Sequence, residues 1–157
     1  IEGFGGGVQA RCYGWTMKDS YIHGITLEGG SHGNGVQSSA YGGVTLDHNT
    51  IINEQNRTDA VMLTNDFAPQ NDDHVTDNLL AGGGYTIYAG DTGSGGGCAG
   101  QCNNMVITGN RLDRTVYPAD GSGGGTGGAF NWITAIPPGG AAISGNYWDD
   151  DLSPANP

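Results

Sequence analysis

A short pattern that recurs five times along the chain constrains its fold more than any other feature of the sequence. Each copy has an apolar residue three positions before a turn-forming residue, which a larger side chain follows. The turn-forming residues are Ser20, Asn49, Asn78, Asn110 and Asn146, separated by 29, 29, 32 and 36 residues. This period is typical of solenoids and lengthens only where the glycine-rich insertions 91–97 and 121–128 intervene. We therefore expect about five coils, one for each repeat.

A second set of short apolar segments indicates the strands of these coils. The segments are residues 7–10, 35–38, 60–63, 85–88 and 131–134. They are rich in Val, Ile, Thr and Tyr and too short for helices. Since an isolated strand cannot bury its inward side chains, equivalent strands of successive coils must pair in parallel around one core. The predicted fold is all-β, a right-handed parallel β-helix.

The recurring asparagines have a structural interpretation within this fold. An asparagine at a tight corner tolerates left-handed backbone geometry, and its amide can bond to the equivalent amide one coil away. We therefore expect an asparagine ladder inside the solenoid.

Three stretches, residues 30–37, 44–51 and 79–88, resemble a known group of proteins. They are similar to right-handed parallel β-helix proteins of the pectate-lyase-like superfamily, especially secreted actinobacterial forms and minor tail proteins of actinobacterial phages. The resemblance covers most of the chain and implies an extracellular or virion-surface location. It leaves the chemistry open, because this scaffold carries lyases, hydrolases, epimerases, adhesins and virion fibres. Asn34 stands where these relatives usually have Asp, and a neutral amide cannot act as a base.

The chain begins inside a predicted coil, at Ile1, with no capping element before it. Because solenoids need a cap over their open core, we interpret residues 1–157 as a single-domain segment of a longer protein that lacks its N-terminal cap.

Charge narrows the choice of partners. Sixteen acidic residues against five basic ones give a formal net charge of −11, which repels nucleic acid and anionic membranes. No apolar run is long enough for membrane insertion. An acidic polysaccharide would be repelled unless calcium bridged the two surfaces. The composition favours neutral glycans or calcium-assisted binding, with no other cofactor required.

Several polar residues are candidates for chemistry on a sugar polymer. Asp66 directly follows a predicted strand and Asp59 directly precedes it, so both are candidate acids or bases. His32 lies in a glycine-rich corner, where its imidazole can act near neutral pH. Arg57 is a candidate substrate-binding residue. Asp72 and Asp73 are candidate calcium ligands.

Aromatic residues are the other candidates for sugar binding. Tyr85, Tyr88 and Trp132 lie in predicted strands, where their rings could stack on sugars. Strict alternation predicts that Tyr85 and Tyr88 point to opposite sides of their strand.

Two of the three cysteines are close enough in sequence for a short-range disulfide, which would fit an oxidising compartment. Cys98 and Cys102 share one glycine-rich loop and are predicted to form a disulfide, whereas Cys12 is expected to be a small buried residue.

Our leading hypothesis is an extracellular or virion-surface β-helix that recognises polysaccharide along a lateral sheet. One alternative is a polysaccharide-degrading lyase or glycoside hydrolase, and another is a structural adhesin or fibre segment with no glycan site. A homotrimer is expected if the chain belongs to a tail fibre.

Overall fold

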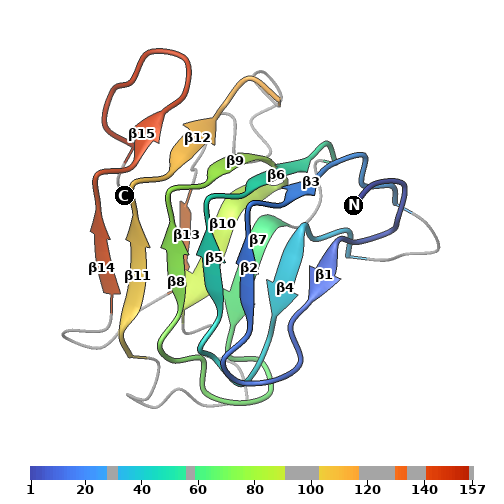
Figure 1. Cartoon of the computed structure of the whole chain (residues 1–157), viewed down its shortest axis with the longest axis vertical. Coiled ribbons are helices and arrows are strands. Elements are labelled where there is room, and N and C mark those ends of the chain that lie inside the picture. The colour runs from blue at the N-terminus through green and yellow to red at the C-terminus, as the bar shows by residue number, and fades with distance from the viewer. Residues whose placement is uncertain (28–31, 56–58, 91–102, 117–129, 134–140, 156–157) are drawn as a thin grey trace.

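The computed structural model describes residues 1–27, 32–55, 59–90, 103–116, 130–133 and 141–155, which form strands, turns and loops without a helix. In this part of the chain, three parallel sheets of five strands are stacked as a solenoid (Figure 1). Sheet A contains β1 (Val8–Gln9), β4 (Val36–Ser38), β7 (Asp59–Thr64), β10 (Tyr85–Gly90) and β13 (Phe130–Ile133). Sheet B contains β2 (Thr16–Lys18), β5 (Thr45–Asp47), β8 (His74–Thr76), β11 (Met105–Thr108) and β14 (Ala141–Ser144). Sheet C contains β3 (Tyr21–Ile22), β6 (Thr50–Asn53), β9 (Leu79–Gly82), β12 (Arg111–Asp113) and β15 (Tyr147–Trp148).

Each repeat contributes one strand to each sheet, which confirms the predicted parallel β-helix. The register matches the sequence pattern, because the apolar position of one repeat pairs with the apolar position of the next. In sheet C the paired inward residues are Ile22, Ile51, Leu80 and Leu112. In sheet B they are Met17, Leu46, Val75, Ile107 and Ile143. The four residues of the sheet C column are fully buried, and each contributes about 1.5–3 kcal/mol through burial of its apolar surface.

The predicted asparagine ladder is present at the corner between sheets B and C. Asn49 donates through its side-chain amide to Oδ1 of Asn78, Asn78 donates to Asn110, and Asn110 donates to Asn146, at 2.9–3.0 Å. Each Oδ1 also accepts the backbone N–H of the preceding rung. Ser20 continues the column, since its backbone N–H donates to Oδ1 of Asn49.

The left-handed residue at this corner is not the asparagine, which corrects the sequence-based expectation. It is the residue immediately before each rung: Asp19, His48, Asp77, Gly109 and Gly145, with φ between 49° and 71°. Tight turning therefore falls to an exposed Asp or His or to a glycine, while the asparagine keeps an ordinary backbone and directs its amide into the ladder.

A loop closes the outer edge of sheet C at β15. The backbone N–H of Trp148 donates to the carbonyl of Ser153, and that of Ala155 donates to the carbonyl of Asn146. Tyr147 and Pro154 form an antiparallel bridge. The guanidinium of Arg114 lies 4.8 Å from the ring centroid of Trp148 and pairs with Asp150 and Asp151 of the loop. β15 thus has neighbours on both sides.

Replacing Asn78 by Leu should lower the free energy of unfolding by about 3 kcal/mol or more. The change leaves the buried Leu46 carbonyl and the backbone and side-chain amides of Asn49 without their partner, at about 1–3 kcal/mol for each unpaired group. Chemical denaturation of this variant and of Thr16→Ala, an exposed control, measures the effect. Equal stability of the two variants would contradict a role for the ladder in stability.

Candidate functional site

The outer surface of sheet A carries a row of side chains aligned by the strand register. Register aligns Gln9 with Gln37, Gln37 with Met62 and Met62 with Tyr88. The inward positions of the same strands are apolar or small, such as Val36, Val61 and Ile87, and they are fully buried. Two amides, a thioether and a phenol therefore form a continuous outward row across four strands.

Hydrogen bonds hold the amides of this row in place. Oε1 of Gln37 accepts from Nε2 of Gln9 at 3.4 Å and from Nδ2 of Asn34 at 3.1 Å, while its Nε2 donates to Oγ of Ser39 at 3.1 Å. Arg11 donates to Oε1 of Gln9 through Nε and Nη2. Such a network fixes the directions of the side chains before any ligand arrives.

Asp59 occupies the flank of the row, at the start of β7. Asn34 and Asp59 each stand two residues before the paired Val36 and Val61, and the backbone N–H of Asp59 donates to Oδ1 of Asn34 at 3.0 Å. Asp59 thus occupies the position in its coil that Asn34 occupies in the preceding coil. Asp59 is only 5% exposed, and burial raises its pKa to about 7, opposed by a hydrogen bond from the Tyr85 backbone.

Asp66 lies beyond the other end of β7, where its Oδ2 accepts from the hydroxyl of Thr64 at 2.8 Å. Burial raises the pKa of Tyr88, and the charges of Asp59 and Asp66 raise it further. Both carboxyl groups are therefore close enough to Tyr88 to act on its titration. Tyr88 pairs with Met62 in the middle of β7, and the two carboxyl groups stand at the opposite ends of that strand.

Tyr85 and Tyr88 lie side by side, which corrects the prediction that they point to opposite sides. Their ring centroids are 6.1 Å apart, and Tyr85 is 41% exposed. Tyr85 is the first residue of β10, where the neighbouring Gly83 bridges to Asp59, so strict alternation does not yet apply. The two rings form one aromatic surface beside Asp59.

The remaining predicted residues differ in their relation to this surface. His32 is exposed and lines an open hollow of about 450 Å³ together with Gln9, Asn34 and Gln37. Trp132 lies in β13 and pairs with Ala89, but its side chain is outside the described part of the chain. Arg57 also lies outside the described residues.

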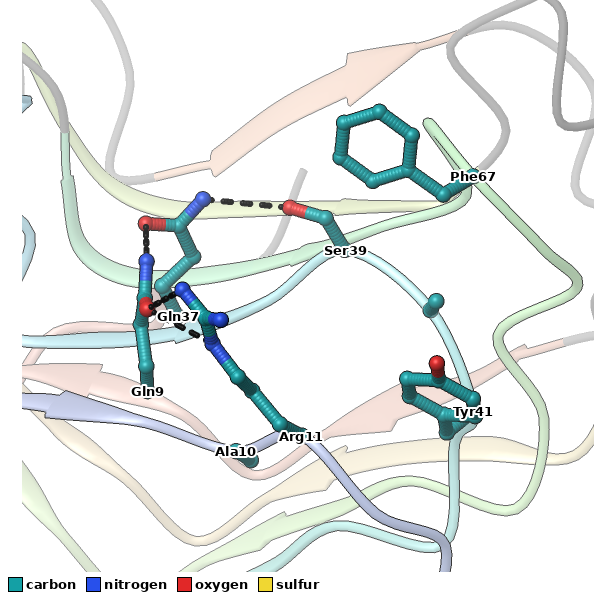
Figure 2. Close-up of a pocket in the computed structure, with 8 residues that line it drawn as sticks. Gln9, Ala10, Arg11, Gln37, Ser39, Tyr41 and Phe67 are labelled. Atoms are coloured by element: carbon teal, nitrogen blue, oxygen red, sulfur yellow. Dashed lines mark hydrogen bonds between the residues drawn. The ribbon is translucent and has the colours of Figure 1, made fainter.

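Sequence reasoning missed a groove that adjoins the row. The Arg11 groove, of about 300 Å³, is lined chiefly by Gln9, Arg11, Gln37, Ser39, Tyr41 and Phe67 (Figure 2). Its lining comes from β1, β4 and the segments that follow β1, β4 and β7, and the Phe67 N–H donates to the Ser39 carbonyl at 3.1 Å between two of these segments. The recurring triplets 7–9 and 35–37, each Gly-Val-Gln, were the available signal for its two glutamines.

Asp72 and Asp73 lie away from this surface, at the turn before β8. Asp72 accepts from Nδ2 of Asn104 at 2.8 Å and from the Tyr13 hydroxyl at 2.9 Å, and these bonds lower its pKa. Oδ1 of Asp73 accepts the backbone N–H of Val44 at 2.9 Å. No group of three His, Cys, Asp or Glu side chains gathers as metal ligands among the described residues. Calcium binding at Asp72 and Asp73 stays a prediction, and an ion there would compete with these bonds.

The structure tests one of the two predictions made for the cysteines. Cys12 is exposed and carries a free thiol, so the expectation of a buried residue is wrong. It lies in the turn between β1 and β2, outside the inward columns. The predicted Cys98–Cys102 disulfide falls outside the described residues.

Comparisons with known proteins do not assign a function to this surface. No family model, curated protein or solved structure matches the chain. Within the described residues, no helix has the length and apolar character that crossing a membrane requires.

Replacing Asp73 by Asn should stabilise the protein, relative to the wild type, increasingly as the pH rises from about 4 to about 7, with little further change above about pH 8. Burial raises the pKa of Asp73 from 3.8 to about 7, so the folded state holds this proton more tightly than the unfolded chain. The stabilisation is complete below the unfolded pKa and is lost as the pH rises through the folded value. Melting temperatures across this range measure the difference, with the exposed Asp77→Asn as control. A difference that does not change with pH would show that Asp73 titrates normally.

Proposed function

We propose that this chain is a polysaccharide-binding β-helix whose binding surface is the outer surface of sheet A. The observation that carries the proposal is the outward row of Gln9, Gln37, Met62 and Tyr88, with Tyr85 beside it. Fixed amides offer both donors and acceptors to sugar hydroxyls, and tyrosine rings stack on the apolar faces of sugars. An extended polymer fits such a row, since one strand spacing of about 4.8 Å repeats along it.

The setting of this activity is also a proposal. We place the protein outside the cell or on a virion surface, as in the pectate-lyase-like β-helix proteins that the sequence resembles. If it forms part of a phage tail fibre, a homotrimer is the expected assembly.

Polysaccharide cleavage is the second candidate function, and Asp59 is the observation that favours it. A buried carboxyl with a pKa of about 7 keeps its proton to near neutral pH, as a general acid must. It could donate that proton to a glycosidic oxygen. Asp66 lies beyond the opposite end of the six-residue β7, about 16 Å along the strand, so it could not act on the same bond. A structural adhesin or fibre segment is the third candidate, without a glycan site.

Tyr88→Ala should weaken retention on a bound polysaccharide roughly 5- to 30-fold, as expected for the loss of a central aromatic contact. Affinity electrophoresis in gels containing neutral or uronate polysaccharides measures retention. Tyr21→Ala is the matched control, because Tyr21 is an exposed tyrosine on sheet C. Equal loss in both variants would argue against sheet A as the binding surface.

Asp59→Asn distinguishes binding from cleavage. If the protein cleaves, this variant should lose about 10²–10⁴ in rate with retention intact, because it removes the acid and keeps the shape. New reducing ends report either reaction, and ultraviolet absorbance of an unsaturated uronate reports a lyase alone. If the wild type is retained on the polysaccharide but does not cleave it, the binding function stands. If it shows neither retention nor cleavage, the structural fibre segment is favoured.

A further inference from the structure

Arg11 differs from every other lysine and arginine that the structure describes. The others pair with carboxylates: Lys18 with Asp47, Arg111 with Asp149, and Arg114 with Asp150 and Asp151. Arg11 instead donates two hydrogen bonds to the neutral Oε1 of Gln9. In a chain of net charge −11, a guanidinium without a carboxylate partner is a local positive site.

The remaining donors of Arg11 are available to a ligand. A guanidinium has five N–H groups, and two of them are used by Gln9. The other three meet no acceptor within the described residues. Arg11 lines the groove on the same side as Gln9 and Gln37, and Tyr41 and Phe67 lie across from it (Figure 2). The groove lining includes no acidic side chain.

Two exposed aromatic rings form the opposite wall. Phe67 is 81% exposed and Tyr41 is 56% exposed. Tyr41 has φ 86°, an unfavourable conformation for a bulky residue, and it is followed by Gly42 and Gly43, which also have positive φ. A Cβ on Gly42 would lie 2.2 Å from the Asn71 carbonyl oxygen, so packing against the next coil holds this turn in place. Strain of this kind is concentrated at ligand sites, and an exposed ring gains little for the fold itself.

Acidic side chains near β7 limit the charge of a sugar that could bind there. Asp59 and Asp66 lie at the two ends of β7, and Asp66 is near the groove, because its Oδ2 accepts from the hydroxyl of Thr64, which contacts Oγ of the groove-lining Ser39 at 3.4 Å. A second anionic sugar near β7 would lie within the Debye length of about 8 Å from these carboxylates and would be repelled. The neutral amides and tyrosines of the row suit uncharged sugars instead.

We propose that the Arg11 groove binds an anionic substituent of a glycan, a carboxylate or a sulfate ester, whose neighbouring sugars are neutral. Arg11 pairs with the anion, Tyr41 and Phe67 contact the ring that carries it, and the row beyond binds the uncharged units. This inference rests on the proposed glycan-binding function and assigns it a sparsely charged polymer, recognised without a bridging cation.

The test uses an oligosaccharide in which hexuronate alternates with neutral N-acetylhexosamine, and the same oligosaccharide with its carboxylates reduced to alcohols. Calorimetric titration in the presence of a chelator should give the wild type roughly 10- to 100-fold higher affinity for the acidic form, as expected for a charge-assisted pair. Arg11→Gln should bind both forms at the lower affinity. Arg111→Gln is the matched control, with the same charge change on sheet C, and should resemble the wild type.

Further probes separate the parts of the proposal. A neutral oligosaccharide with a single sulfate ester tests which anion is bound. Tight binding of this probe without tight binding of the carboxylate form assigns sulfate. A homopolymer of uronate should bind no better than the reduced form, and equal affinity for it and the alternating form would overturn the requirement for neutral neighbours. Tyr41→Gly relieves the backbone strain, so it should fold at least as stably and still weaken binding of both forms.

Two outcomes distinguish this inference from the proposed function. Equal wild-type affinity for the acidic and reduced forms, unchanged in Arg11→Gln, would overturn the anion site while glycan binding stands. No affinity for any probe, with a native melting temperature, would overturn both.

Discussion

The corner between sheets B and C sets a constraint on which the rest of the molecule depends. At each turn the chain must leave one strand and enter the next, so backbone groups there cannot all join a sheet, and buried polar groups without partners are costly. The asparagine column satisfies them, since Nδ2 of Asn78 bonds to the Leu46 carbonyl and its Oδ1 to the Asn49 N–H. The same bonds recur although the repeats differ by up to seven residues in length. Register in all three sheets follows from this column, and so does the alignment of Gln9, Gln37, Met62 and Tyr88.

The features that local pattern could predict are those that repeat. The apolar residue three positions before Asn49 or Asn78 specified both the ladder and the strand pairing, because neighbouring coils present the same chemistry at the same place. Positions that depart from the repeat could not be predicted from the local pattern. Tyr85 lies at a strand entry where alternation has not begun, and the left-handed conformation belongs to the residue before each asparagine. Tyr41 and Phe67 line one groove because segments of neighbouring coils lie side by side there, which no local pattern encodes.

Formal charge overstates the negative character of the folded chain. The count of −11 treats every carboxyl as ionised, yet Asp59 and Asp73 have pKa values of about 7 because both are buried. Near neutral pH each is about half protonated, so the folded protein is less negative by about one charge. Part of this reduction falls on the surface that carries the tyrosine pair, where Asp59 lies. Mild acidification therefore changes the electrostatics of that surface more than the composition suggests.

The loop beside β15 has a consequence for association between molecules. An edge strand with free N–H and C=O groups is a template for another chain, and parallel stacks of short strands are especially prone to growing end to end into filaments. The bonds from Trp148 to Ser153 and from Ala155 to Asn146 occupy these groups. Arg114, held between Trp148 and two aspartates, adds a charged cluster over the same edge. A second molecule that approached sheet C here would have to displace this loop. The loop therefore opposes fibril-like association at this edge.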